Sequence, residues 1–140
     1  MSPLNDKDWS SARRLFGDGG LSVVLPCHNL ATTIVENLTR LNELLATKDF
    51  PYQLIPIDDG SSDGTGDALQ ALAKQFPAIQ PICFPENRGK GAAVLAGAQR
   101  AQCAWVLLLD GDFDLDPTML PTFCDVAETS NASIITGSKL

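Results

Sequence analysis

The sequence lacks several features that mark common kinds of functional site. Histidine occurs once, at His28, and the four cysteines contain no Cys-x-x-Cys pair, so their spacing fits neither a zinc cluster nor a redox dithiol. The Gly-x-x-x-x-Gly-Lys-Ser/Thr pattern of a Walker phosphate-binding loop is also absent. Because His28 has no identifiable nucleophile partner, we assign no catalytic residue.

Long apolar runs and an excess of basic residues are missing too. No stretch of some 18 apolar residues is present, and residues 1–20 have no apolar core of the signal-peptide type. The net charge of −7 argues against a nucleic-acid partner, because phosphate backbones require a basic surface. We expect a cytoplasmic protein with reduced thiols. Any association with the cytoplasmic face of a membrane would depend on a part outside this chain.

Short β-branched runs alternate with amphipathic segments along the chain. At 140 residues, 44% of them hydrophobic, the chain can form one domain with a substantial core. The alternation predicts an α/β fold with an open, mainly parallel sheet and helices on both faces. We expect residues 1–20 to form an N-terminal arm. The predicted strands are 21–26, 52–58, 79–84, 104–110 and 133–137, and the predicted helices are 33–45, 65–76, 91–101 and 117–128.

Two prolines lie inside predicted strands. Pro56 falls in the second strand and Pro81 in the third. Proline has no backbone N–H to donate to a neighbouring strand. We therefore expect a bulge or a short, poorly paired stretch at one of them.

An acidic pair follows the most hydrophobic predicted strand. Asp110 and Asp112 flank Gly111, and alternate residues of an extended chain project to the same side, so both carboxylates can face one cation. Gly111 leaves room for a ligand near the backbone, and Asp114 and Asp116 add further oxygen donors within the same turn. Mg²⁺ or Mn²⁺ bridging two phosphates would suit this set. The alternative is that Asp-Gly merely ends the strand and the other aspartates are solvated.

A second acidic pair follows the second predicted strand. Asp58 and Asp59 precede a Gly-Ser-Ser-Asp-Gly-Thr turn, and carboxylates there can accept hydrogen bonds from a base N–H or a ribose hydroxyl. The turn residues can also simply cap the next helix. His28, after the first strand, can stack on a base or donate a hydrogen bond, although a lone histidine is more often structural.

A basic segment precedes the third predicted helix. Arg88 and Lys90 alternate with glycines, at a point where the helix N-terminus also favours anions. These cations can steady a diphosphate. As an isolated motif, however, the segment is better explained as a solvated helix start.

Taken together, the motifs resemble those of the family 2 inverting glycosyltransferases of GT-A fold, a Rossmann-like fold. The branch they resemble most is that of dolichyl-phosphate mannosyltransferases and glucosyltransferases. The resemblance runs from Leu21 to the end of the chain. It is carried by Val23–Asn29 (VVLPCHN), Asp58–Thr65 (DDGSSDGT), Asn87–Ala93 (NRGKGAA), Leu109–Asp112 (LDGD) and Gly137–Lys139 (GSK).

The resemblance implies roles for particular residues. Asp110 and Asp112 would correspond to the metal-binding Asp-x-Asp motif, with Asp114 as a further ligand to Mg²⁺ or Mn²⁺. Residues 21–140 would then form the part that binds a UDP- or GDP-linked sugar. The residues expected to contact this donor are Pro26, His28, Ile57, Asp58, Asp59, Arg88, Lys90, Asp110, Gly111 and Lys139.

Three positions depart from the family pattern. The family usually has tyrosine at His28, glutamate at Leu30 and arginine at Lys139, and lysine cannot make the bidentate phosphate contact of an arginine. Members of the family also continue into an acceptor-binding half that supplies the catalytic base. We therefore expect this chain to be the N-terminal half only, which leaves the catalytic base unassigned.

These patterns leave three functional hypotheses. The first is a metal-dependent glycosyltransferase whose acceptor is a sugar or, as the resemblance implies, a polyprenyl phosphate. The second is a nucleotide-binding module without turnover, because its acceptor half is missing. The third is a sugar nucleotidyltransferase, which would need a Gly-rich basic loop after the first strand, where the sequence has Pro26–Leu30 (PCHNL) instead.

Overall fold

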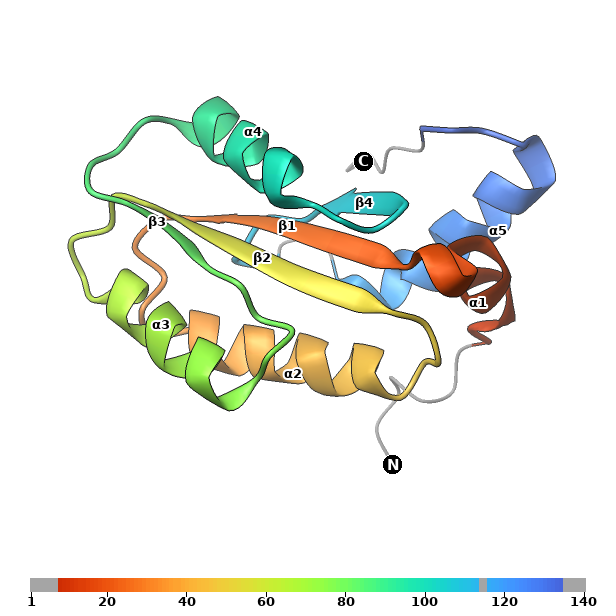
Figure 1. The fold of residues 1–140 in the computed structure, drawn as a ribbon, viewed down its shortest axis with the longest axis horizontal. Helices are drawn as coiled ribbons and strands as arrows, with labels where there is room; N and C mark the ends of the chain where they lie inside the picture. The colour runs from red at the N-terminus through yellow and green to blue at the C-terminus, as the bar shows by residue number, and fades with distance from the viewer. Residues whose placement is uncertain (1–7, 114–115, 135–140) are drawn as a thin grey trace.

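The structure, a computed structural model, describes residues 8–113 and 116–134. Within these ranges four strands form one parallel sheet in the order β3-β2-β1-β4 (Figure 1). This confirms the predicted α/β class. The predicted fifth strand, 133–137, lies mostly outside the described residues. The observed strands are β1 (Leu21–Cys27), β2 (Tyr52–Asp59), β3 (Ile82–Phe84) and β4 (Trp105–Leu108).

Helices cover both faces of the sheet, as predicted. In Figure 1, α2 and α3 lie beneath the sheet and α4 lies above it. In the part of the chain that the structure describes, every helix is too short or too polar to cross a bilayer. The helices are α1 (Ser10–Phe16), α2 (Ile34–Ala46), α3 (Thr65–Gln75), α4 (Lys90–Arg100) and α5 (Leu120–Ser130), with 3₁₀ turns η2 (Gly17–Gly19) and η3 (Pro117–Met119).

The central strand β1 is buried against helices on both sides. Val23 and Leu25 belong to a large apolar cluster that includes the α2 residues Ile34 and Leu38. Val24 points the other way, into a smaller cluster beneath α4. Each such buried aliphatic side chain contributes about 1.5–3 kcal/mol of burial free energy. This double burial explains why β1 is apolar at almost every position.

The residues that precede β1 pack into the same core. Trp9 and Phe16 are buried, and the Phe16 ring meets the ring of Phe50 edge to face, with 5.0 Å between their centroids. Helix α1 packs against α5, and the Arg14 guanidinium pairs with the Glu128 carboxylate at 2.8 Å. The segment predicted as an arm therefore contributes directly to the core.

The two strand prolines lie opposite each other. Ile57 pairs with Ile82 and Leu54 bridges to Ile79, so the same register aligns Pro56 with Pro81. Leu54 makes both its backbone hydrogen bonds toward β3, and Pro56, two residues on, faces the same side. Its missing N–H therefore interrupts the β2–β3 ladder and leaves the pairing with β1 intact. The expected poorly paired stretch is confirmed at this point.

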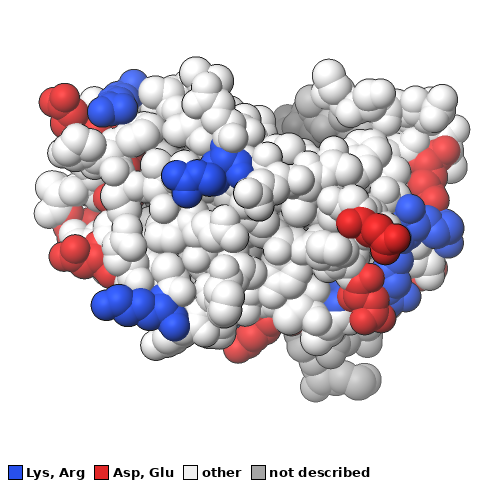
Figure 2. Space-filling view, in the orientation of Figure 1, with Lys and Arg blue, Asp and Glu red and all other residues white. Residues whose placement is uncertain are grey.

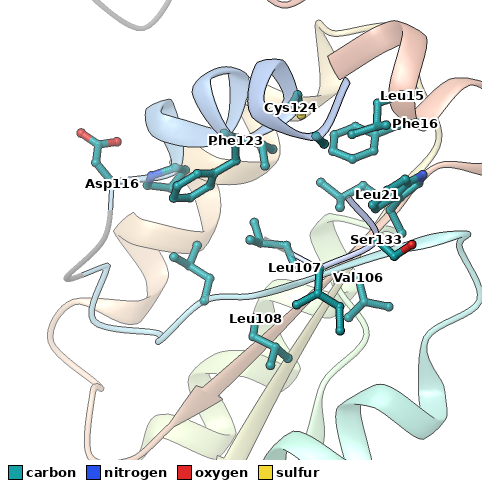
Figure 3. A pocket seen from close by; sticks show the side chains of 16 residues that line it. Leu15, Phe16, Leu21, Val106, Leu107, Leu108, Asp116, Phe123, Cys124 and Ser133 are labelled. Carbon is teal, nitrogen blue, oxygen red and sulfur yellow. The ribbon is translucent and has the colours of Figure 1, made fainter. Parts of the chain in front are cut away.

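Strand β4 forms the outer edge of the described sheet. Helix α4 packs over β1 and β2. Val106 and Leu108 of β4 point to the same side of the sheet but lie beyond this helix, and they are 46% and 54% exposed. The most hydrophobic of the predicted strands is therefore half exposed on this face among the described residues. A groove of about 410 Å³ runs along β4, with Phe123 and Cys124 of α5 on its far wall (Figure 3). Most of its lining is apolar.

Candidate functional site

Hydrogen bonds join the loop after β1 to the loop after β2. The Asn29 N–H donates to Ser61 Oγ at 2.9 Å, and Asn29 Oδ1 accepts the Ser62 N–H at 3.0 Å. The Leu30 N–H donates to Thr65 Oγ1 at 2.9 Å. These bonds fix the predicted His28 segment beside the predicted Asp58–Asp59 segment. Thr33, the residue before α2, makes no side-chain capping bond.

Asp59 links the carboxyl ends of three strands. Its carboxylate accepts the N–H groups of Arg88 at 2.7 Å and Gly89 at 3.1 Å, which orders the loop between β3 and α4. Its backbone carbonyl accepts from His28 Nδ1 at 3.0 Å. Because a carbonyl can only accept, Nδ1 of His28 carries the proton. Nε2 is then an acceptor, which agrees with the Asn29 side-chain amide 3.3 Å away.

The other two predicted residues of β2 are also enclosed. Asp58 is 5% exposed, and its Oδ1 accepts the N–H of Ser61 at 3.0 Å. Ile57 is fully buried beneath α4, where its Cδ1 lies near Gly97. A contact between Ile57 and a nucleotide would therefore have to come from its main chain. The Asp58 carboxylate thus contributes to the ordering of its own turn.

Gly60 allows the loop after β2 to touch the loop after β3. Its φ is +66°, and a Cβ there would lie 2.2 Å from the backbone nitrogen of Asn87. Any other residue would combine left-handed strain with a backbone clash. This contact brings the basic segment against the acidic one.

The Asp110–Asp112 segment is a turn attached to β1. The N–H groups of Leu109 and Gly111 donate to the carbonyls of Val24 and Pro26, each at 3.0 Å, so the alignment with β1 continues past Leu108. The Phe113 N–H then donates back to the Asp110 carbonyl at 3.0 Å. Asp112 thus lies inside a turn. Strand alternation is therefore the wrong reason for relating its carboxylate to that of Asp110.

The two predicted cations behave differently. Lys90 Nζ lies 2.9 Å from Asp110 Oδ1, which brings the start of α4 to the Asp110 turn. The Arg88 guanidinium lies over the Phe84 ring, 4.7 Å from its centroid. Both side chains therefore lie at the carboxyl edge of the sheet, where a diphosphate was expected.

A hollow of about 290 Å³ lies on the α2 side of the Asp110 turn. Asn37, Arg40 and Asp112 all line it. Asn37 Nδ2 also donates to the Gly111 carbonyl at 3.2 Å. Asn37 was not among the predicted site residues, although its spacing from Ile34 and Leu41 puts a polar residue on the buried stripe of α2.

Cys27 lies between the two acidic pairs. It is 2% exposed and pairs with Asp58 across the sheet. Burial raises the pKa of the Cys27 thiol to about 12, with a further contribution from Asp58 and smaller ones from Asp110 and Asp112. The two acidic pairs thus share one edge of the sheet, on either side of the end of β1.

The residues present fit a divalent cation that is shared with a ligand. Among residues 8–113 and 116–134, no three His, Cys, Asp or Glu side chains converge as a metal cage. Two aspartates suffice for a cation that takes its remaining ligands from phosphate and water. Asp110 already pairs with a cation, the Lys90 ammonium. The predicted residues Asp114 and Lys139 lie outside the described residues.

Acidic and basic side chains are scattered over the face that Figure 2 shows, and most of that face is uncharged. Asp116, predicted as a further oxygen donor, accepts the Thr118 N–H at 2.9 Å with its Oδ1 and so caps η3.

Curated proteins similar to this chain act on lipid phosphates. An undecaprenyl-phosphate 4-deoxy-4-formamido-L-arabinose transferase of Serratia proteamaculans is 32% identical over 77% of this chain and 33% of its own length. A dolichyl-phosphate beta-glucosyltransferase of Trichomonas vaginalis is 31% identical over 85% of this chain and 40% of its own. The chain thus spans about a third to two fifths of these relatives.

Solved structures give the same fold. A mannosyltransferase of Pyrobaculum calidifontis, in complex with GDP-Man and Mn²⁺, has a TM-score of 0.57 at 26% identity. The match covers 74% of this chain and 33% of the mannosyltransferase. TarS of S. aureus with UDP-GlcNAc has a TM-score of 0.56 at 25% identity, covering 66% of this chain and 26% of TarS. The model of glycosyl transferase family 2 matches residues 22–139, so this chain belongs to that family.

Proposed function

We propose that this chain is the donor-binding part of a glycosyltransferase that uses a UDP- or GDP-linked sugar. The observation that carries the proposal is the meeting of three strand ends at Asp59, beside the Asp110 turn. Ligands of open α/β sheets bind at the carboxyl ends of the strands. The similar mannosyltransferase and TarS were solved with GDP-Man and UDP-GlcNAc, which supports a nucleotide-sugar ligand here.

Asp110 and Asp112, with Asp114, would hold Mg²⁺ or Mn²⁺. The cation would supply charge stabilisation to the leaving nucleoside diphosphate. Gly111 has no side chain to obstruct the approach of the donor. Lys90 would exchange its contact with Asp110 for one with the diphosphate, since both partners are exposed.

The first two strand ends would receive the nucleoside. His28 offers an exposed ring, and its Nε2 would exchange the Asn29 amide for a donor on the base. Pro26 and the main chain of Ile57 would line the base, with Asp58 and Asp59 beneath it. Arg88 and Lys139 would add positive charge near the phosphates.

The acceptor would be a sugar or a polyprenyl phosphate. Both similar curated enzymes are named for lipid-phosphate acceptors, which favours the phosphate. A phosphate acceptor is already an anionic nucleophile, so it needs no general base in this chain. Such an acceptor would place the enzyme at the cytoplasmic face of a membrane.

A second candidate is a module that binds the nucleotide without transferring the sugar. The chain spans about a third of the first of these relatives, so donor binding by this chain and transfer by a whole enzyme are separate proposals. Incubation of the purified chain with donor and acceptor, beside a binding assay, separates the two. Nucleotide binding without sugar release or transfer supports the module.

A thermal-shift panel tests the proposal. UDP, GDP, CDP and dTDP are each added with and without Mn²⁺, because a ligand that binds only the folded state raises its melting temperature. We expect UDP or GDP to give the largest shift, and Mn²⁺ to enlarge it. Asp112→Ala should lose the Mn²⁺-dependent part and keep the rest. If no diphosphate shifts the parent protein, the proposed function is wrong.

A further inference from the structure

The peptide units around Gly111 are held from two sides. From β1, the Pro26 carbonyl accepts the Gly111 N–H at 3.0 Å. From α2, the Asn37 side-chain amide donates to the Gly111 carbonyl at 3.2 Å. Gly111 is itself buried, and a Cβ there would lie 2.7 Å from Cys27 Sγ. The residue between the two exposed aspartates is therefore fixed at both its donor and its acceptor.

The two contacts differ in kind. The bond from Gly111 to Pro26 is between backbone atoms and continues the pairing of β4 with β1, so the sheet supplies it for any sequence. The bond from Asn37 depends on one side chain. Gly111 is followed by Asp112, so the peptide that Asn37 holds by its oxygen is the one that leads into Asp112.

Fixing that peptide limits where the Asp112 carboxylate can be. A turn residue with an unheld carbonyl can rotate its peptide plane, which moves the next Cα and the side chain attached to it. Phe113 has a positive φ of 55°, a conformation that non-glycine residues adopt only when neighbouring contacts impose it. The Asn37 bond is a contact of this kind, one residue before Asp112.

We propose that Asn37 is a positioning residue for the Asp110–Asp112 turn, and that its amide orders the turn for cation binding. This rests on the proposed function, since it presumes that the turn binds Mg²⁺ or Mn²⁺. Metal affinity typically falls 10–100-fold when a side chain that holds a metal ligand in place by hydrogen bonding is removed. Asn37 acts on the turn through the Gly111 carbonyl.

The test measures Mn²⁺ affinity directly, from the electron paramagnetic resonance signal of free Mn²⁺ titrated into the purified chain. Asn37→Ala removes the amide, Asn37→Leu removes it at nearly constant size, and Asn37→Gln keeps a donor. The matched control is Asn42→Ala on the same helix, where Asn42 Oδ1 accepts the Tyr52 hydroxyl at 2.8 Å. Melting temperatures are recorded for every variant.

We expect Asn37→Ala and Asn37→Leu to weaken Mn²⁺ binding about tenfold. Asn37→Gln should recover most of that affinity, and Asn42→Ala should bind Mn²⁺ like the parent even where it melts earlier. Alanine and leucine are better helix formers than asparagine, so a lower helix content would not explain the loss.

Two results overturn the positioning role while the cation site stands: unchanged affinity in Asn37→Ala and Asn37→Leu, or an equal loss in Asn42→Ala. If the proposed function is wrong, the titration gives a different result, because the parent protein itself then binds no Mn²⁺. In that case the positioning role falls with it.

Discussion

Lys90 Nζ lies 2.9 Å from Oδ1 and 3.2 Å from Oδ2 of Asp110, so a side-chain ammonium occupies the carboxylate proposed to bind the metal. The Lys90 and Asp110 side chains are 68% and 47% exposed. Exposed pairs of this kind are worth roughly 0.2–1 kcal/mol. A divalent cation can displace such a weak partner, which would release Lys90 toward the diphosphate.

Lys90→Ala should therefore change two affinities in opposite directions. Without nucleotide, Mn²⁺ should bind about two- to fivefold more tightly, because the competing ammonium is gone. With Mn²⁺ present, the nucleoside diphosphate should bind more weakly, because one cation near the phosphates is lost. Calorimetric titrations of each ligand measure both effects.

Lys74→Ala, an exposed lysine of α3, controls for the loss of one positive charge. If Lys90→Ala lowers Mn²⁺ affinity in the absence of nucleotide, Lys90 does not compete for Asp110 and the exchange described above is wrong.

Gly111→Ala should destabilise the protein. A Cβ there would lie 2.7 Å from Cys27 Sγ and 3.0 Å from Leu30 Cδ1. Overpacking of this kind costs about 1–3 kcal/mol of unfolding free energy. Gly91→Ala, in α4 with open space around it, should be neutral or stabilising by up to about 1 kcal/mol. Urea denaturation compares the two, and equal effects would contradict the tight contact at Gly111.

Thiol reactivity should rank the cysteines by burial. Burial raises the pKa of both Cys27 and Cys124 to about 12, so at pH 8 only about one in ten thousand of each is thiolate. Cys83 is exposed, although partial burial raises its pKa as well. Maleimide labelling followed by peptide mass spectrometry should find Cys83 modified well before the other two. Early labelling of Cys27 would mean that the end of β1 opens in solution.

Asp63 should make part of the stability dependent on pH. Hydrogen bonds from Thr65 and Ala31 hold the pKa of its carboxyl below the usual 3.8. A carboxyl whose pKa is lowered by folding stabilises the folded state above its unfolded pKa, and this is lost as the pH falls through the folded value. The parent protein should thus have a larger free energy of unfolding than Asp63→Asn at pH 7, and this difference should shrink below pH 3.8.

Denaturation curves at several pH values measure this difference. In a Thr65→Val background, which removes the hydroxyl donor, the same substitution should have a smaller effect. A constant difference between parent and Asp63→Asn from pH 7 to pH 3 would exclude the carboxylate as its source.

The sequence was sufficient to predict the sheet and most helix boundaries. Apolar periodicity and the glycines and prolines between segments are local signals. From them, both ends of α2, α3 and α4 were predicted to within two residues. The alignment of Pro56 with Pro81 needed the register between β2 and β3. That register is set by long-range pairing, which the local pattern does not encode.

The candidate site was predicted by residue type better than by geometry. Asp58 and Asp59 are at the expected edge of the sheet, yet their carboxylates bond to neighbouring backbone N–H groups. The turn at Asp110 depends on Pro26 and Asn37, which are more than 70 residues away in the chain. Such contacts depend on the order of the strands in the sheet. The order became visible only in the fold.

Asp110 and Asp112 are proposed to bind a cation that also binds the phosphates of the donor. Calorimetry with the preferred nucleoside diphosphate and its parent nucleoside, each with and without Mn²⁺, tests this proposal most directly. We predict that Mn²⁺ raises the affinity for the diphosphate about tenfold, equivalent to about 1.4 kcal/mol of binding free energy. The affinity for the nucleoside should not change. Equal diphosphate affinity with and without Mn²⁺ would mean that the two aspartates hold no cation shared with the donor.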